Sequence, residues 1–128
     1  MVKISIVIPA YNEEKRIVDT IQAYLVMFDK EYKNAYEIIV VPNNCTDNTA
    51  AIVAGVAKKH DNIKIKDIRH YVGKSGAIVE GLKIAKGNLI GFVDADNSAP
   101  PESFLKLIKE IKENDGAIGS RWVKGAEV

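Results

Sequence analysis

The sequence predicts an α/β fold built on a mostly parallel β-sheet. Short runs of β-branched residues alternate with longer segments of helical periodicity, as in βαβ units. Glycine and proline fall where one pattern gives way to the next. The 128 residues suffice for one domain with a modest core, and no linker or internal repeat divides them. We therefore expect residues 1–128 to form a single domain.

Four β-branched runs are the predicted parallel strands. They lie at residues 4–8, 37–41, 63–68 and 89–93. Each is short and is followed by a turn-forming segment, which is typical of strands joined by crossover helices. A fifth short strand is expected at residues 117–120.

Helical spacing is clearest in the segment after the first strand. Its apolar residues recur at intervals of three and four and predict one buried helix face, made of Ile17, Val18, Ile21, Tyr24, Leu25 and Phe28. Further helices are expected at about residues 47–60, 74–86 and 100–113. In the last of these, the inward-facing residues would be Phe104, Leu105, Ile108 and Ile111.

The composition excludes several classes of protein. Eighteen Lys and Arg against seventeen Asp and Glu give a net charge of +1 without a basic block, which disfavours nucleic-acid binding. Cys45 is the only cysteine, so an internal disulfide or a cysteine zinc cage is excluded. No signal peptide or membrane-spanning stretch is visible. The expected location is the cytoplasm or the cytoplasmic face of a membrane.

Ligands of such sheets bind beyond the carboxyl ends of the strands, so the loops there hold the candidate site residues. Asp94 and Asp96 flank one small residue at the end of the predicted fourth strand. Two carboxylates that close repel unless a cation intervenes, and a divalent ion shared with substrate phosphates is the usual solution. The alternative is that Asp96 or Ser98 caps the next helix, with Pro101 near its first position. Spacing alone leaves both open.

Three other segments, each between a predicted strand and the next predicted helix, place polar groups at the carboxyl edge of the sheet. After Pro9, Asn12 or Glu13 could lie beside a ligand, although the segment is also a normal strand-to-helix turn. Asn44 tolerates a left-handed backbone, and Thr46 or Asp47 could cap the helix that follows. Lys74 begins a helix between two glycines, where it would face an anion or remain a solvated lysine.

Taken in order, the segments SIVIPAYNEE, EIIVVPNNCTDNT, GKSGAIVEGL, GNLIGFVDADNSAPPE and GSRWVKG resemble the family-2 glycosyltransferases. The resemblance implies the GT-A fold, a three-layer α/β/α sandwich with a mostly parallel sheet. It implies transfer of a sugar, with inversion, from a nucleotide-diphosphate sugar bound with Mg²⁺ or Mn²⁺. The branch that makes polyprenyl-phosphate sugars is the most similar, which suggests a lipid phosphate acceptor, a saccharide being the alternative.

The resemblance also implies roles for individual residues. The nucleotide would lie against Pro9, Ala10, Tyr11 and Glu13. In the catalytic acidic pair, Asp94 would contact the sugar nucleotide and Asp96 would bind the metal. The residues expected to face phosphate or acceptor are Lys74 and Arg121.

Two departures from the family pattern matter. Asn43 stands where the family usually has a base-contacting Asp, which predicts altered nucleotide selectivity. The family also continues well beyond the GSR segment into acceptor-binding elements. A complementary segment from a partner could supply these, or the chain could be a fragment or a non-catalytic nucleotide-sugar-binding module. Self-association into a homo-oligomer is a further expectation. A receiver-type signalling domain fits less well, because it expects an acidic pair after the first strand, where Pro9, Ala10 and Tyr11 stand.

Overall fold

The computed structural model describes residues 2–96, 100–113 and 122–124, and from residue 111 onward only the backbone. Strands and helices alternate as predicted. The elements are β1 (Ile4–Ala10), α1 (Ile17–Tyr32), β2 (Tyr36–Pro42), α2 (Thr49–Lys59), β3 (Ile63–Ile65), α3 (Gly73–Ile84), β4 (Leu89–Phe92), α4 (Pro101–Glu113) and β5 (Trp122–Lys124).

The sheet has the strand order β3-β2-β1-β4-β5. The first four strands are parallel, and β5 pairs with β4 in the antiparallel direction. The fifth strand predicted at residues 117–120 falls outside the described residues, whereas β5 lies at Trp122–Lys124. Because β2 and β4 flank β1 on opposite sides, the connections diverge at β1 and leave a crevice beyond its carboxyl end.

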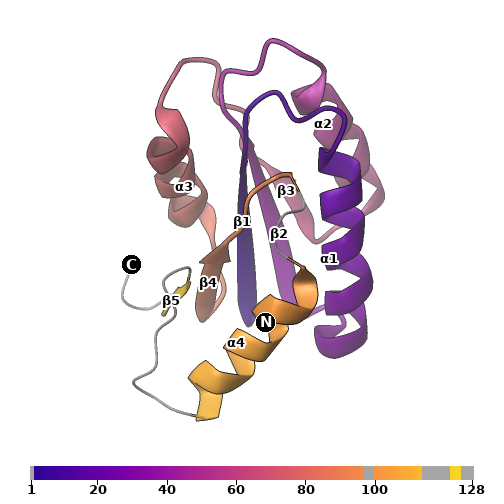
Figure 1. Ribbon diagram of the computed structural model, residues 1–128, viewed down its shortest axis with the longest axis vertical. Coiled ribbons are helices and arrows are strands. Elements are labelled where there is room, and N and C mark those ends of the chain that lie inside the picture. The colour runs from indigo at the N-terminus through magenta and orange to yellow at the C-terminus, as the bar shows by residue number, and fades with distance from the viewer. Residues whose placement is uncertain (1, 97–99, 114–121, 125–128) are drawn as a thin grey trace.

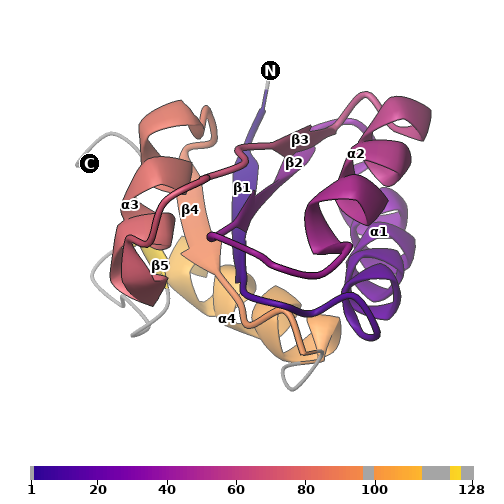
Figure 2. The same ribbon diagram turned by 90° about the horizontal axis from the view of Figure 1, so that it is seen from above.

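Helices cover both faces of the sheet, which gives the three layers expected (Figure 1). In the view from above, α3 lies on one side of the sheet and α1 and α2 on the other (Figure 2). α4 joins the α1 side, since Phe104, Leu105 and Ile108 share one buried cluster with residues of α1 and β1. β1 is buried along its whole length, as a central parallel strand is when both of its faces are covered.

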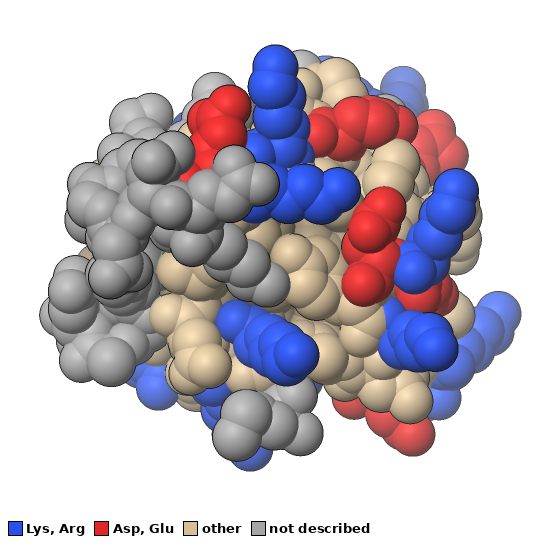
Figure 3. Space-filling view, turned by 90° about the horizontal axis from the view of Figure 1, so that it is seen from below, with Lys and Arg blue, Asp and Glu red and all other residues tan. Residues whose placement is uncertain are grey.

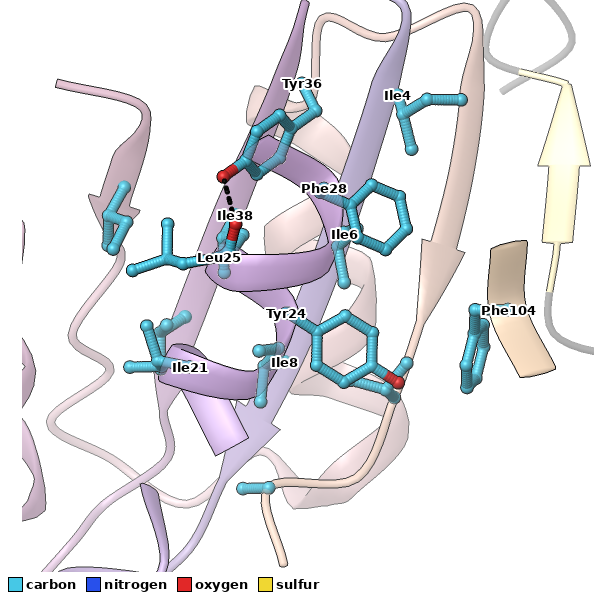
Figure 4. Close-up of a cluster of buried hydrophobic side chains, with 14 of the residues drawn as sticks. Ile4, Ile6, Ile8, Ile21, Tyr24, Leu25, Phe28, Tyr36, Ile38 and Phe104 are labelled. Carbon is cyan, nitrogen blue, oxygen red and sulfur yellow. Dashed lines mark hydrogen bonds between the residues drawn. The ribbon is translucent and has the colours of Figure 1, made fainter. Parts of the chain in front are cut away.

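Aromatic rings connect α1 to its neighbours in the larger core cluster. The Tyr24 ring lies 6.0 Å from Phe28 and 5.9 Å from Phe104, and Phe28 lies 5.6 Å from Tyr36 (Figure 4). The Tyr36 hydroxyl donates a hydrogen bond to the carboxylate of Asp29, and the Leu25 carbonyl lies 3.4 Å from the same hydroxyl oxygen. Each ring buries a large apolar area, so this cluster is a principal source of the hydrophobic stabilisation that holds α1 and α4 to the sheet.

One residue of the predicted face of α1 is placed differently. Val18 is 38% exposed, and Thr20 is fully buried. Thr20 was not predicted to face inward because its hydroxyl makes it look like a surface residue. The hydroxyl is satisfied within the fold, since it donates to the Ala95 carbonyl at 2.7 Å and also lies 3.1 Å from the Arg16 carbonyl.

The surface at the amino ends of the strands carries both charge signs. In the view from below, the Lys and Arg side chains are interspersed with Asp and Glu (Figure 3). This arrangement agrees with the near balance of charges along the chain. Among the described residues visible there, no extended region of one sign forms.

Gly81 allows α3 to lie close to β1. A Cβ atom at position 81 would be 2.4 Å from the Val7 Cγ1 atom and 3.3 Å from Val41 Cγ2. Val7 is fully buried and its branched side chain is stiff. We therefore expect Gly81→Ala to lower the free energy of unfolding by about 1 to 2 kcal/mol, because overpacking outweighs the better helix propensity of alanine.

Gly55 in α2 provides the matched control, because nothing lies within 4 Å of a Cβ built there. Gly55→Ala should raise the free energy of unfolding by up to about 1 kcal/mol. Chemical denaturation of both variants measures the contrast. Equal stabilisation by the two substitutions would show that α3 does not depend on this close approach.

Candidate functional site

A cavity of about 590 Å³ lies at the carboxyl ends of the parallel strands, and we call it the strand-end cavity. Figure 2 views the molecule from this end of the sheet. The wall is formed by the end of β1, by residues just after β1, β2 and β4, and by the start of α3 with the loop before it. The lining residues are Pro9, Ala10, Tyr11, Glu13, Asn43, Tyr71, Gly73, Lys74, Ala77, Asp94, Ala95 and Asp96.

The cavity therefore brings together every site residue implied by the family resemblance except Arg121, which lies outside the described residues. Asn12, named as an alternative to Glu13, does not line it. A second cavity of similar volume lies at the amino ends of the strands. None of the predicted site residues lines it. The strand-end cavity is thus the candidate site.

Hydrogen bonds join the loop after β1 to the loop after β2. Asn12 adopts a left-handed backbone with φ of 50°, and its Oδ1 accepts from the Thr46 N–H at 2.8 Å. The Glu13 N–H donates to the Thr49 hydroxyl at 2.9 Å. Asn44 adopts the left-handed backbone conformation that its residue type tolerates, with φ of 51°, as predicted. Side chains of each loop thus accept hydrogen bonds from backbone N–H groups of the other. These bonds fix the part of the cavity wall that carries Tyr11 and Glu13.

Asp47 strengthens the same junction. Its carboxylate accepts from the Thr49 N–H at 3.0 Å and from the Glu14 N–H at 3.3 Å. The helix begins at Thr49, two residues later than expected, so Asn48 and not Thr46 or Asp47 holds the capping position, and Asp47 instead binds the first helical N–H. Partial burial raises the pKa of Asp47, but these hydrogen bonds and the Thr49 hydroxyl outweigh it and hold the pKa below the ordinary value. The carboxylate therefore stays ionised where the two loops meet.

Asp94 and Asp96 both line the strand-end cavity. The carbonyl of Ala95 between them accepts a 2.7 Å hydrogen bond from the buried Thr20 hydroxyl, which ties this segment to α1. Asp96 does not occupy the helix-capping position, because α4 begins at Pro101 and the residue before it is Pro100. Ser98, the other capping candidate, lies outside the described residues.

Lys74 at the start of α3 reaches across to this acidic segment. Its Nζ lies 2.6 Å from Asp94 Oδ1, and both side chains are partly exposed, at 62% and 39%. The pair places a cation and a carboxylate in one solvent-accessible wall. An anionic ligand that enters the cavity can replace Asp94 as the partner of the Lys74 ammonium group. The free-energy cost of breaking the ion pair is small, because exposed ion pairs are weak.

The donor set fits a hard divalent ion that is only partly held by protein. Within the described part of the chain, no three His, Cys, Asp or Glu residues gather as metal ligands. Asp94 and Asp96 offer carboxylate oxygens at the open edge of the sheet. Magnesium-type ions commonly use one or two carboxylates and take their other ligands from phosphates and water.

Sequence reasoning did not single out Tyr71. Its side chain is 75% exposed and lines the strand-end cavity beside Gly73, whose φ of 73° suits glycine. An exposed aromatic residue in a strand-end loop was the available signal. Ala77 and Ala95 were also not predicted, because small apolar residues carry no chemical signature of a site.

The fold and the site define an α/β domain that offers a mixed-charge cavity, with aromatic and amide groups in its wall, at the crevice of a parallel sheet. The glycosyl transferase family 2 model matches residues 5–128, and this chain belongs to that family. The similarity of the structure to solved glycosyltransferases confirms the GT-A fold.

Two relatives illustrate the similarity in sequence. A dolichyl-phosphate beta-glucosyltransferase of Trichomonas vaginalis is 41% identical over 94% of this chain and 39% of its own length. The dolichol-phosphate mannosyltransferase of Pyrococcus furiosus is 35% identical over 98% of this chain and 35% of its own. The chain thus spans somewhat more than a third of the length of these relatives.

Solved structures show the same relation. The S. aureus TarS fragment in complex with UDP has a TM-score of 0.72 and 29% identity, and the match covers 88% of this chain and 33% of that one. A mannosyltransferase of Pyrobaculum calidifontis in complex with GDP-mannose and Mn²⁺ has a TM-score of 0.76 and 22% identity, with 91% and 34% covered. In the described part of our chain, no helix has the length and hydrophobicity needed to span a bilayer.

Proposed function

We propose that residues 1–128 form a single domain that binds a nucleotide-diphosphate sugar with Mg²⁺ or Mn²⁺ and acts in its transfer, with inversion, to an acceptor. One observation carries this proposal. Apart from Arg121, the residues predicted as nucleotide, phosphate and metal contacts come from four separate segments, and they line one cavity. Complexes of similar glycosyltransferases with UDP, and with GDP-mannose and Mn²⁺, support it.

Each group in the wall has a role in this proposal. The nucleoside lies along the segment after β1 and against Asn43. Lys74 faces the diphosphate, and Arg121 contacts phosphate or acceptor. Asp94 contacts the sugar nucleotide, and Asp96 binds the ion.

The reaction that suits these groups is a displacement at the anomeric carbon. An acceptor oxygen forms a bond to this carbon, the bond to the diphosphate oxygen breaks, and the nucleoside diphosphate leaves with the electron pair. Asp96 would hold a divalent ion, which would supply Lewis-acid stabilisation of the leaving group. Lys74 adds a positive charge toward the same oxygens.

A polyprenyl phosphate is the acceptor we favour. Its oxygen is already anionic and requires no strong general base. The names of the dolichyl-phosphate and dolichol-phosphate transferases among the relatives support this choice. Because the chain spans little more than a third of those proteins, we propose that acceptor-binding elements come from outside the 128 residues, from a complementary segment or a second copy.

A thermal-shift panel tests the proposal. UDP, GDP, CDP and their sugars are added to the protein with and without Mn²⁺. A ligand present at about 100 times its Kd should stabilise the fold by about 2.7 kcal/mol. We expect this stabilisation to require both the ion and the diphosphate, and to be lost in Asp96→Asn.

Asp61→Asn is the matched control, because Asp61 is exposed and lines only the second cavity. It should retain the full shift. No response to any nucleotide with Mn²⁺ would contradict the proposal. Binding without release of nucleoside diphosphate, when polyprenyl phosphate is added, would show that the 128 residues bind the donor but do not complete the transfer by themselves.

A further inference from the structure

Asn43 is a buried polar residue in the wall of the strand-end cavity. It follows β2 and is only 5% exposed. Its backbone N–H donates to the Ala10 carbonyl at 2.8 Å, and the residue forms a parallel bridge with Ile68. The Asn43 backbone is thus held by Ala10 on one side and Ile68 on the other, which fixes the position of its Cα atom.

The orientation of the Asn43 amide is set by a backbone donor. The Val72 N–H donates to Asn43 Oδ1 at 3.3 Å. Because a backbone N–H can only donate, the atom facing it must be the oxygen and not the nitrogen. The side-chain oxygen is therefore engaged by the protein, and the NH₂ group lies in the same plane on the opposite side of the Cβ–Cγ bond axis.

The NH₂ group of Asn43 has kept its capacity to donate. None of the described residues accepts a hydrogen bond from Nδ2. Nor is Nδ2 among the solvent-excluded side-chain atoms without a partner, so it retains contact with solvent. Since Asn43 lines the strand-end cavity, Nδ2 offers a hydrogen-bond donor to a ligand there.

The surroundings suit a planar heterocycle. Tyr11 and Tyr71, at 57% and 75% exposure, line the same cavity. Tyr71 directly precedes Val72, whose N–H holds the Asn43 amide. Exposed aromatic rings stack readily on the faces of nucleobases, which leaves the edge of the base to be read by a polar group.

Bases differ in what they present at the ring nitrogen of the pairing edge. In cytosine this nitrogen is an acceptor, whereas in uracil it carries a hydrogen and is a donor. A fixed N–H donor satisfies the first and opposes the second. An unmatched polar pair in a buried wall loses affinity because neither group recovers its hydrogen bond to water.

We propose that Asn43 is a specificity-determining residue that favours nucleoside diphosphates whose pairing-edge ring nitrogen is an acceptor, as in cytidine, over those in which it is a donor, as in uridine. This inference rests on the proposed function of the strand-end cavity. It assigns the selection to one atom, Nδ2, and to the backbone contact that orients it.

The substitution Asn43→Asp changes that atom while it preserves shape. One carboxylate oxygen keeps the bond from the Val72 N–H, and the other replaces the donor with an acceptor. Asn44→Asp is the matched control, since it adds the same charge one residue away and does not line the cavity. Asn44 has φ of 51°, a conformation that aspartate also adopts.

Calorimetric titration of the full chain with CDP and UDP in the presence of Mn²⁺ gives the test, well above the pH range of carboxyl titration. We expect the wild-type protein to bind CDP about fivefold to tenfold more tightly than UDP. In Asn43→Asp the ratio of the two affinities should move at least tenfold toward UDP. In Asn44→Asp both affinities should change together and leave the ratio unaltered. An equal ratio in all three proteins would overturn the inference.

A second measurement needs no variant. A cytidine diphosphate in which the pairing-edge ring nitrogen is replaced by C–H should bind the wild-type protein about fivefold to tenfold more weakly than CDP. Equal binding of the two compounds would contradict the role of Nδ2. If no nucleotide binds even with Mn²⁺, the proposed function fails and takes this inference with it. If nucleotides bind in a manner that depends on Asp96 but the ratio does not respond to Asn43→Asp, this inference alone fails.

Discussion

Glu37→Gln is expected to lower the free energy of unfolding by about 3 kcal/mol, which is the largest change in stability we expect from any polar substitution in the sheet. For a chain of this size the melting temperature should fall by roughly 10 °C. Urea unfolding monitored by circular dichroism measures the difference. The expectation follows from the position of Glu37, which is only 1% exposed although it lies in the second strand of the sheet.

The Glu37 carboxylate connects three parts of the fold. One oxygen accepts from the Ser5 hydroxyl at 2.6 Å and from the Lys86 N–H at 2.7 Å. The other lies 2.8 Å from the Lys64 ammonium. A glutamine replaces one acceptor with a donor and removes the charge, so either the ammonium or the buried donors lose their partner. Because the Lys64 side chain is 36% exposed, its ammonium group can be hydrated in the variant. The loss of folding free energy therefore lies near the lower end of the range for breaking a buried ion pair.

The same substitution should change how stability depends on pH. Burial raises the pKa of Glu37, but Lys64, Ser5 and the Lys86 N–H together outweigh it and hold the pKa below the ordinary value of 4.5. A lowered pKa in the folded state means that the stabilisation is fully present above pH 4.5 and is lost as the pH falls through the folded-state pKa. The difference between wild type and Glu37→Gln should therefore shrink on acidification.

Glu80→Gln is the control for this prediction. Glu80 also pairs with a lysine, Lys83, at 2.7 Å, but on the surface of α3 and one helical turn away. Exposed pairs of this type contribute little, so no measurable change in stability is expected. If Glu37→Gln behaved like this control at neutral pH, the buried network would not stabilise the fold.

Lys74→Gln is expected to weaken the binding of nucleoside diphosphates by about 10-fold to 100-fold, which corresponds to the loss of a charge-assisted hydrogen bond to phosphate. The stability of the free protein should hardly change, because the Lys74 and Asp94 side chains are 62% and 39% exposed. Titration calorimetry with Mn²⁺ and CDP or UDP measures the loss. The affinity of the variant should also depend less on salt concentration than that of the wild type.

Two further variants isolate the charge. Lys74→Arg retains a cation that binds phosphate and should keep most of the affinity. Lys83→Gln removes an equivalent charge from the same helix, where the side chain pairs with Glu80 away from the cavity. Unchanged affinity in Lys74→Gln, or an equal loss in Lys83→Gln, would show that Lys74 does not contact the diphosphate.

Much of the fold could be predicted from local patterns. The runs that became β1, β2 and β4 are fully or largely buried, and continuous apolar runs of that length are typical of parallel strands covered on both faces. Shorter signals were less reliable. β3 ends at Ile65, and Ile68 contributes only an isolated bridge to Asn43, although the pattern at residues 63–68 looked continuous. A three-residue strand such as β5 has too few residues to show a period.

The candidate site was predictable because parallel topology has a geometric consequence. Once the strands are parallel, their carboxyl ends meet at one edge, so Glu13, Asn43, Lys74 and the acidic pair converge although they are far apart in sequence. Whether Asp96 caps the next helix was not predictable. It depended on where α4 begins, and helix boundaries are the least certain part of any pattern.

The sequence by itself determined the alternation of elements, the edge of the sheet at which the candidate site lies and the chemical types of the groups there, because these follow from periodicity and side-chain identity. Tertiary structure alone decided how those groups are oriented and held. Val72 turns the Asn43 amide so that it presents a donor, and Thr20 fixes the segment between the two aspartates. Lys64 keeps Glu37 ionised inside the sheet. These contacts join residues far apart in the chain, and their energies depend on distance and burial, which no local pattern encodes.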